Sequence, residues 1–227
     1  LVPHFEKMLY DNSQLARLTF AAYQATGQTF YKKIGEEILE YVLREMTDPL
    51  GGFYSTQDAD SEGKEGKFFV WTPQEIKAVL GEEIGGLICR HYGVTETGHF
   101  ERKNILHIRQ PIDNLAKERG KTAEELEQIF GEAKQKLFLE RERRVKPFRD
   151  EKILTSWNGL MIGGLALAGR HLNETDFIDA AAAAADFARR VLWQDGRLKA
   201  VSKREQAYLA AYLDDHAYLR DGLLELL

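Results

Sequence analysis

The chain has 227 residues, enough for one large domain or two small ones. Its hydrophobic content of 44% and charged content of 30% are those of an ordinary soluble globular protein. The net charge of −5, with no dominant basic stripe, argues against a nucleic-acid partner. The densest basic run, residues 141–149, follows a glutamate-rich segment, and we interpret it as a solvated helix end.

Cysteine content, hydropathy and missing motifs restrict the compartment, the membrane partners and the cofactors that we expect. Cys89 is the only cysteine, so the sequence has no disulfide framework, no CxxC pair and no cysteine zinc site, in agreement with a cytoplasmic location. No apolar run approaches the ~20 residues of a membrane span, so we expect no membrane partner. Glycine-rich phosphate loops are missing as well, and we expect no cofactor.

Residues 1–50 predict a helical hairpin. Apolar residues at helical spacing line a first helix that stops near Gly27 and a second helix that ends at the Asp48-Pro49 break. The sequence GGFYSTQDADSEGKEGKFFVW follows, at 51–71. Its aromatic runs, 53–55 and 68–71, predict two short strands that flank an acidic loop with glycine turns.

This acidic loop is the most informative local pattern in the chain. It carries four carboxylates: Asp58, Asp60, Glu62 and Glu65. Carboxylates held together raise one another's pKa and suit proton transfer, cation binding or contacts with sugar hydroxyls, although a solvated surface loop has the same composition. The loop does not form an EF-hand, because Phe69 stands where a bidentate glutamate is required, and we assign no metal.

The middle of the chain predicts helices separated by irregular segments. Capping boxes at 72–75 and 122–125 begin two of them, the second running to about residue 144. We interpret 84–150 as an insertion, with a short strand at 104–108.

A second helical hairpin is predicted at 152–200. It consists of a glycine-bearing helix, 157–170, whose small residues allow a neighbouring helix to approach closely, and an alanine-rich helix, 177–193. A turn into a short strand follows, and a further hairpin begins within 206–227.

The two hairpins form an internal repeat. Tyr10 and Trp157 lie 147 positions apart, and Asp48 and Asp195 have the same separation. Repeated helical hairpins with strands after the second helix predict an all-α fold, an (α/α) toroid in the form of a partial barrel with short β-hairpin insertions. We therefore expect a single partial-barrel domain over 1–227.

Five segments in this order resemble one known family, the thioredoxin-domain-containing proteins of the spermatogenesis-associated family: 4–16, 51–71, 103–107, 152–170 and 213–219. The resemblance implies a thioredoxin-like domain followed by an (α/α)6 barrel similar to those of six-hairpin glycosidases and N-acylglucosamine 2-epimerases. The thioredoxin-like domain is absent from this chain, so no redox function is carried over. The barrel also lacks hairpins, and its uncovered apolar helix faces predict self-association.

The resemblance implies a carbohydrate-type small molecule as ligand, bound in a bowl where the inner helices of the barrel begin. We expect acid–base catalysis from six residues near these helix starts and in the acidic loop: His4, Asp11, Asp58, Asp60, Asp215 and His216. We expect substrate binding from five more: Glu6, Asn12, Trp157, Asn158 and Asp214. Helix capping with packing is the alternative for Asp11, Asn12, Trp157 and Asn158.

These observations favour a sugar-related enzyme of the glycosidase or epimerase type. The alternative is a catalytically silent barrel that binds a ligand or a protein partner. An enzyme loses turnover when its acidic residues are replaced, whereas a scaffold has no turnover to lose.

Overall fold

A computed structural model of the chain describes residues 2–227 and divides them into two compact units. Unit 1 comprises residues 2–5 and Ala59–Phe148, and unit 2 comprises Glu6–Asp58 and Arg149–Leu227. Each unit has its own cluster of buried apolar side chains. The excursion from the repeated hairpins therefore begins at residue 59 and includes most of the acidic loop, whereas the predicted start, residue 84, lies inside a helix.

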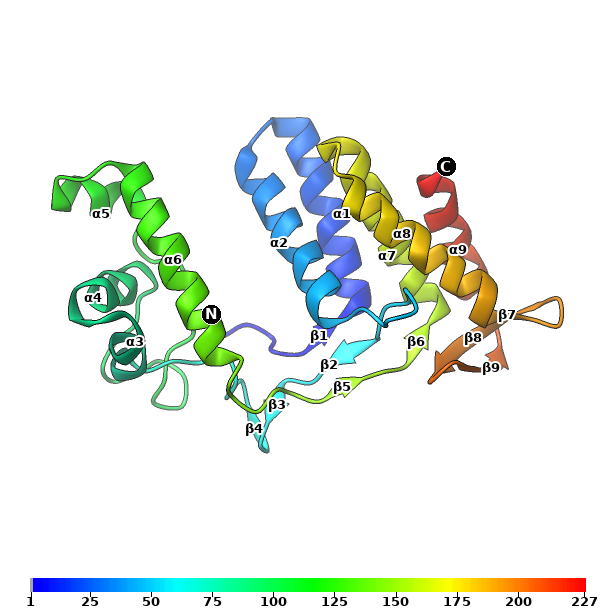
Figure 1. Cartoon of the computed structure of the whole chain (residues 1–227), viewed down its shortest axis with the longest axis horizontal. Helices are drawn as coiled ribbons and strands as arrows, with labels where there is room; N and C mark the ends of the chain where they lie inside the picture. The colour runs from blue at the N-terminus through cyan, green and yellow to red at the C-terminus, as the bar shows by residue number, and fades with distance from the viewer. Residues whose placement is uncertain (1) are drawn as a thin grey trace. The chain divides into compact units, whose positions relative to one another are not determined.

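Unit 2 is built from two helical hairpins and a fifth helix, with short strands at one end (Figure 1). Its helices are α1 (Leu9–Thr26), α2 (Thr29–Glu45), α7 (Thr155–Leu172), α8 (Thr175–Phe187), continued by a π-helical turn (Ala188–Leu192), and α9 (Leu213–Leu226). One antiparallel sheet has the order β1 (Lys7–Met8), β2 (Thr56–Gln57), β5 (Arg149–Asp150). In the other, β8 (Arg197–Lys203) pairs with β6 (Ile153–Leu154), β7 (Trp193–Gln194) and β9 (Gln206–Ala210).

The predicted internal repeat is present, but its offset is 146 positions. Helices α1 and α7 both have 18 residues, and each follows a two-residue strand. Both end at a residue in the left-handed conformation, Gly27 in α1 and Asn173 in α7. The aromatic match of Tyr10 with Trp157 is therefore displaced by one residue from the structural equivalence, in which Asn12 corresponds to Asn158.

Helices α1, α7 and α9 lie side by side and run in the same direction. Near their starts, Tyr10 contacts Trp157, and the Ser156 N–H donates to Asp215. Near their ends, Gln24 contacts His171, and Arg170 pairs with Glu225. All three helices begin at the end of unit 2 that carries the strands (Figure 1).

Glycines on α7 allow this close packing, as predicted. A Cβ atom on Gly159 would collide with the backbone of Tyr218 and Leu219, and one on Gly222 would collide with Gly159. Gly163 lies against the Arg17 guanidinium. The Arg17 side chain reaches from α1 to α9, where its Nη1 lies 2.7 Å from Asp221 Oδ2.

Unit 1 consists of four helices and a β-hairpin whose strands have two residues each. The hairpin pairs β3 (Asp60–Ser61) with β4 (Lys64–Glu65), and the helices are α3 (Pro73–Leu80), α4 (Glu82–His91), α5 (Ile112–Arg119) and α6 (Ala123–Arg141). Both predicted capping boxes are confirmed, at the starts of α3 and α6. Within the described chain, no helix combines the length and apolar character needed to cross a membrane.

Three predicted strands are wrong. Residues 53–55, 68–71 and 104–108 form no ladder, and only isolated bridges remain, at Phe53 with Thr47 and at Trp71 with Asn104. Side chains bond the backbone there instead. The Asn158 amide binds Phe53, and the Arg144 guanidinium binds the carbonyls of Phe68 and Val70.

Candidate functional site

The starts of the three inner helices meet in unit 2. The rings of Tyr10 on α1 and Trp157 on α7 are in edge contact, with centroids 4.8 Å apart and an interplanar angle of 61°. The next pair, α7 and α9, is joined by the 3.0 Å hydrogen bond from Ser156 N–H to Asp215 Oδ1. Helix starts that the sequence separates by up to about 200 positions are thus neighbours.

Asn158 has a structural task at this junction. Its side chain is 1% exposed, accepts a hydrogen bond from Phe53 N–H at 2.8 Å and donates to the carbonyls of Phe53 and Leu154 at 3.0 and 2.9 Å. Asn12, its counterpart in the repeat, donates to Met8 O at 2.7 Å. The buried amide of Asn158 therefore holds the backbone of Phe53 against α7. Because its hydrogen bonds are already made within the protein, it is not available to a ligand.

The Asp215 carboxylate also binds backbone groups of the protein. It is 3% exposed, and its two oxygens accept from Ser156 N–H at 3.0 Å and from Tyr212 N–H at 2.9 Å. One carboxylate thus caps the first turns of both α7 and α9, where the positive ends of the helix dipoles stabilise its charge. Asp215 therefore acts as a helix cap, a role that was not predicted for it from the sequence. For Asn158 the packing part of the alternative describes the observed contacts, because its bonds go to Phe53 and to the Leu154 carbonyl.

The remaining predicted residues on the helix starts are accessible to solvent. Asp11 and Asp214 are exposed, and Trp157 and Asn12 are half-buried. Asp214 lies seven and eleven positions before Asp221 and Glu225, so it shares the helix face on which these residues contact Arg17 of α1. On α1, Tyr10 shares the face of Arg17 by the same spacing, and Asp11 lies one position further round.

The other predicted residues of unit 2 are not on this face of α1 and α9. His216, exposed, lines an apolar groove of about 250 Å³ beside α9, together with Trp193 and Leu223. Glu6, half-buried, precedes β1, and Asp58, exposed, follows β2.

The predicted catalytic residues do not all belong to one unit. His4 and Asp60 belong to unit 1, whereas Asp58 belongs to unit 2. Within the loop, Glu62 forms an ion pair with Lys67 at 2.6 Å. Across residues 2–227, no three His, Cys, Asp or Glu side chains are arranged to hold a metal ion.

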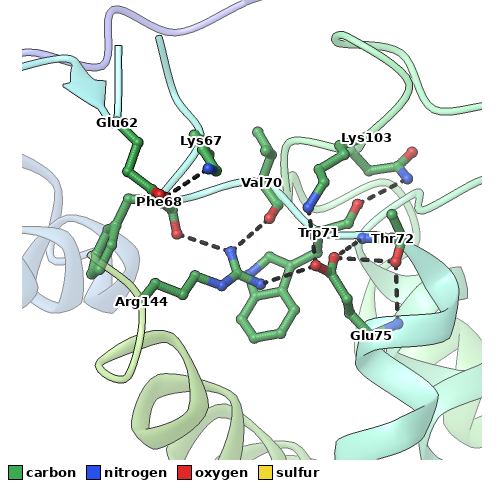
Figure 2. Close-up of polar contacts among 10 residues, drawn as sticks. Glu62, Lys67, Phe68, Val70, Trp71, Thr72, Glu75, Lys103 and Arg144 are labelled. Atoms are coloured by element: carbon green, nitrogen blue, oxygen red, sulfur yellow. Dashed lines mark hydrogen bonds and ion pairs between the residues drawn. The ribbon is translucent and has the colours of Figure 1, made fainter. Parts of the chain in front are cut away.

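Sequence reasoning missed a cation that organises the same loop. The sequence predicts a solvated helix end at Arg144, but its guanidinium lies 4.0 Å from the centroid of the buried Trp71 ring. It donates to the carbonyls of Phe68 and Val70 at 3.0 and 2.8 Å, as Figure 2 shows. Burial lowers the pKa of Arg144 from its ordinary value. No local sequence signal distinguishes this arginine from its exposed neighbour Arg143.

Glu75 completes this cluster (Figure 2). It caps α3 through Thr72 and accepts a hydrogen bond from Lys103 Nζ at 2.9 Å. Burial pushes the pKa of Glu75 upward, but the bonds from Lys103 and Thr72 outweigh it, and the pKa lies below its ordinary value. These hydrogen bonds and ion pairs are typical of a buried polar network, and we interpret the cluster as one that stabilises the fold of unit 1.

The sequence is similar to those of animal proteins over nearly the whole chain. No family model matches it. Over 99% of its length it is 34% identical to spermatogenesis-associated protein 20 of Homo sapiens and 32% identical to the Mus musculus protein of the same name. The chain covers 33% of each of these relatives, about one third of their length.

Comparison with solved structures decides the fold. All of the chain matches 42% of the unsaturated glucuronyl hydrolase of Bacillus sp. GL1, described as responsible for the degradation of glycosaminoglycan, with a TM-score of 0.51 and 14% identity. The chain has the (α/α) toroid fold. The predicted all-α fold class, with a few small sheets, is therefore confirmed.

Proposed function

We propose that unit 2 binds a carbohydrate where α1, α7 and α9 begin, and that the protein is a sugar-processing enzyme of the glycosidase or epimerase type. The observation that carries the proposal is the meeting of the three helix starts, which combines the Tyr10–Trp157 ring pair with accessible carboxylates. Aromatic rings offer apolar faces to sugar rings, and carboxylates accept hydrogen bonds from hydroxyls.

Each accessible residue has a role in this proposal. Trp157, held in orientation by Tyr10, stacks on a sugar ring, and Asn12 binds a hydroxyl. Asp214 and Asp11 serve as the acid and base, since glycoside hydrolysis uses a pair of carboxyl groups. Asn158 and Asp215 act as positioning residues, since they hold the helix starts on which the other side chains stand.

The comparisons support a sugar ligand at the level of fold. The hydrolase from Bacillus sp. GL1 acts on a carbohydrate by its description, and it shares the toroid. Fold similarity alone does not carry a reaction from one protein to another, so the proposal depends on the residues of this chain. The cytoplasmic location expected from the cysteine content stays a prediction.

A thermal-shift experiment tests sugar binding without knowledge of the reaction. Binding to the native state raises the melting temperature by mass action, about 2.7 kcal/mol of stabilisation when the ligand is at one hundred times its Kd. We expect a shift from at least one member of a panel of neutral, amino and uronic sugars, and its loss in Asp214→Asn. The matched control is Asp113→Asn, because Asp113 is the second residue of α5 as Asp214 is of α9.

The same experiment addresses the alternative of a silent scaffold. That alternative is favoured by one observation, the use of Asp215 and Asn158 for backbone hydrogen bonds. If the folded chain shows no shift with any sugar, or if the shift survives Asp214→Asn, the proposed site is wrong.

A further inference from the structure

Unit 1 contains a cleft that the proposed function does not use. The cleft has a volume of about 540 Å³ and lies where α4 ends, between residues 89–95 and 109–110. Small-molecule sites usually measure about 300–1,000 Å³, so a metabolite-sized ligand fits. The charged residues that line it are both arginines, Arg90 and Arg109.

Arg109 is held in place but has no counter-ion. Its backbone N–H donates to His91 O at 2.8 Å, and Gly93, at φ +64°, leaves room for its side chain. A Cβ on Gly93 would lie 3.1 Å from Arg109 Cδ. The guanidinium is exposed, and within the described residues it forms no ion pair.

Arg90, which also lines the cleft, is oriented by a small network. It pairs with Glu118 through one terminal nitrogen, and Glu118 also accepts from Gln110 Nε2 at 2.8 Å. A guanidinium has five N–H donors, so this contact leaves donors for a ligand. Among the lining residues, Thr95 adds a hydroxyl group.

Nearby carboxylates already have partners, one of them Arg90 of the cleft itself. Glu118 binds Arg90, Glu82 pairs with Lys77 at 3.0 Å, and Glu96 accepts from Gln74 at 2.5 Å. None of these glutamates lines the cleft. The cleft wall therefore presents positive charge without a carboxylate of its own.

We propose that this cleft binds a small anionic ligand, a metabolite that carries a phosphate or carboxylate group, through the guanidinium groups of Arg109 and Arg90. Guanidinium forks match the oxygens of both anions, and charge-assisted hydrogen bonds of this kind are about twice as strong as neutral ones. The inference is independent of the sugar site, because it concerns residues of unit 1 only.

Cys89 provides a local readout, because the only thiol of the chain lines this cleft and is 8% exposed. The experiment measures the rate at which N-ethylmaleimide, a neutral reagent, labels Cys89 in the presence of inorganic phosphate, citrate, or sodium chloride at equal ionic strength. An occupied cleft slows labelling by a factor of 1 + [L]/Kd, about tenfold at nine times the Kd. Phosphate and citrate distinguish the two anion chemistries.

Variants locate the effect. We expect Arg109→Gln to abolish the protection, whereas Arg102→Gln, which removes an exposed arginine outside the cleft, retains it. Protection by either phosphate or citrate that depends on Arg109 supports the proposal. Equal slowing by sodium chloride, no slowing by either anion, or protection that survives Arg109→Gln overturns it.

Discussion

Two asparagines in the first turns of α1 and α7 show that burial changes the contacts made by one residue type. Asn12 and Asn158 occupy equivalent positions of the repeat, and each donates to the carbonyl four residues before it. Only Asn158 is buried and also holds both backbone groups of Phe53. The same amide is thus a local helix contact in one hairpin and a long-range clamp in the other.

We predict that Asn158→Ala lowers the free energy of unfolding of unit 2 by about 3 kcal/mol, because it leaves the buried N–H and C=O of Phe53 without partners. Asn12→Ala, the matched control, loses one half-buried hydrogen bond and costs about 1 kcal/mol. Urea denaturation of both variants measures the difference. Equal costs would contradict the clamp.

Glu75 predicts a pH dependence of unit 1. Its pKa is lowered in the folded state, so the contribution of its carboxylate is present above the unfolded value of about 4.3 and is lost as the pH falls through the folded pKa. We expect unit 1 to lose stability as the pH falls below the unfolded value and through the folded pKa of Glu75, and Glu75→Gln to flatten this loss.

The measurement is urea unfolding of unit 1 followed by Trp71 fluorescence, in a background that carries Trp157→Phe and Trp193→Phe. Glu125→Gln is the control, since Glu125 forms the second capping box but makes no ion pair with the described residues. An acid-induced loss that persists in Glu75→Gln would assign the pH dependence to other groups.

At the scale of elements, the contact between α7 and α9 depends on missing side chains. Gly159→Ala places a Cβ against the backbone of α9 and should cost about 2–3 kcal/mol through overpacking. Gly131→Ala, on α6 with no atom within 4 Å of the added carbon, should instead stabilise by about 0.5–1 kcal/mol. Thermal unfolding of the two variants separates close packing from helix propensity; a stabilising Gly159→Ala would refute the close contact.

Local sequence signals predicted the helices well and the strands poorly. The capping boxes at Thr72 and Thr122 are confirmed because both partners lie within four residues of each other. The aromatic run 68–71 fails as a strand because its carbonyls bond Arg144, more than seventy positions away. A pairing of that kind leaves no local pattern.

The candidate site was predictable to a similar degree. Polar residues at the starts of three inner helices indicated a shared location, and contacts at Trp157 and Asp215 bring those starts together. Which of these residues are buried in structural hydrogen bonds was not predictable, because the bonds of Asp215 to Ser156 and of Asn158 to Phe53 involve partners from other segments.

At the scale of the whole molecule, the two proposed sites belong to two units with separate cores. Unit 2 carries the toroid hairpins and the proposed sugar site, and unit 1 carries the anion cleft. A second face of α9, distinct from the one that contacts Arg17, is apolar and exposed: Leu213 is 86% exposed and Leu224 58%. Self-association through this face stays a prediction.

The three tryptophans allow the most direct test of the sugar site. Trp71 lies in unit 1, Trp157 at the helix starts, and Trp193 beside the α9 groove. Their indole N–H signals in a ¹⁵N-correlated NMR spectrum report on three separate places at once. Addition of the sugar that gives the largest thermal shift should move the Trp157 signal and leave the other two in place. Movement of Trp71 or Trp193 with an unchanged Trp157 would contradict sugar binding at the inner-helix starts.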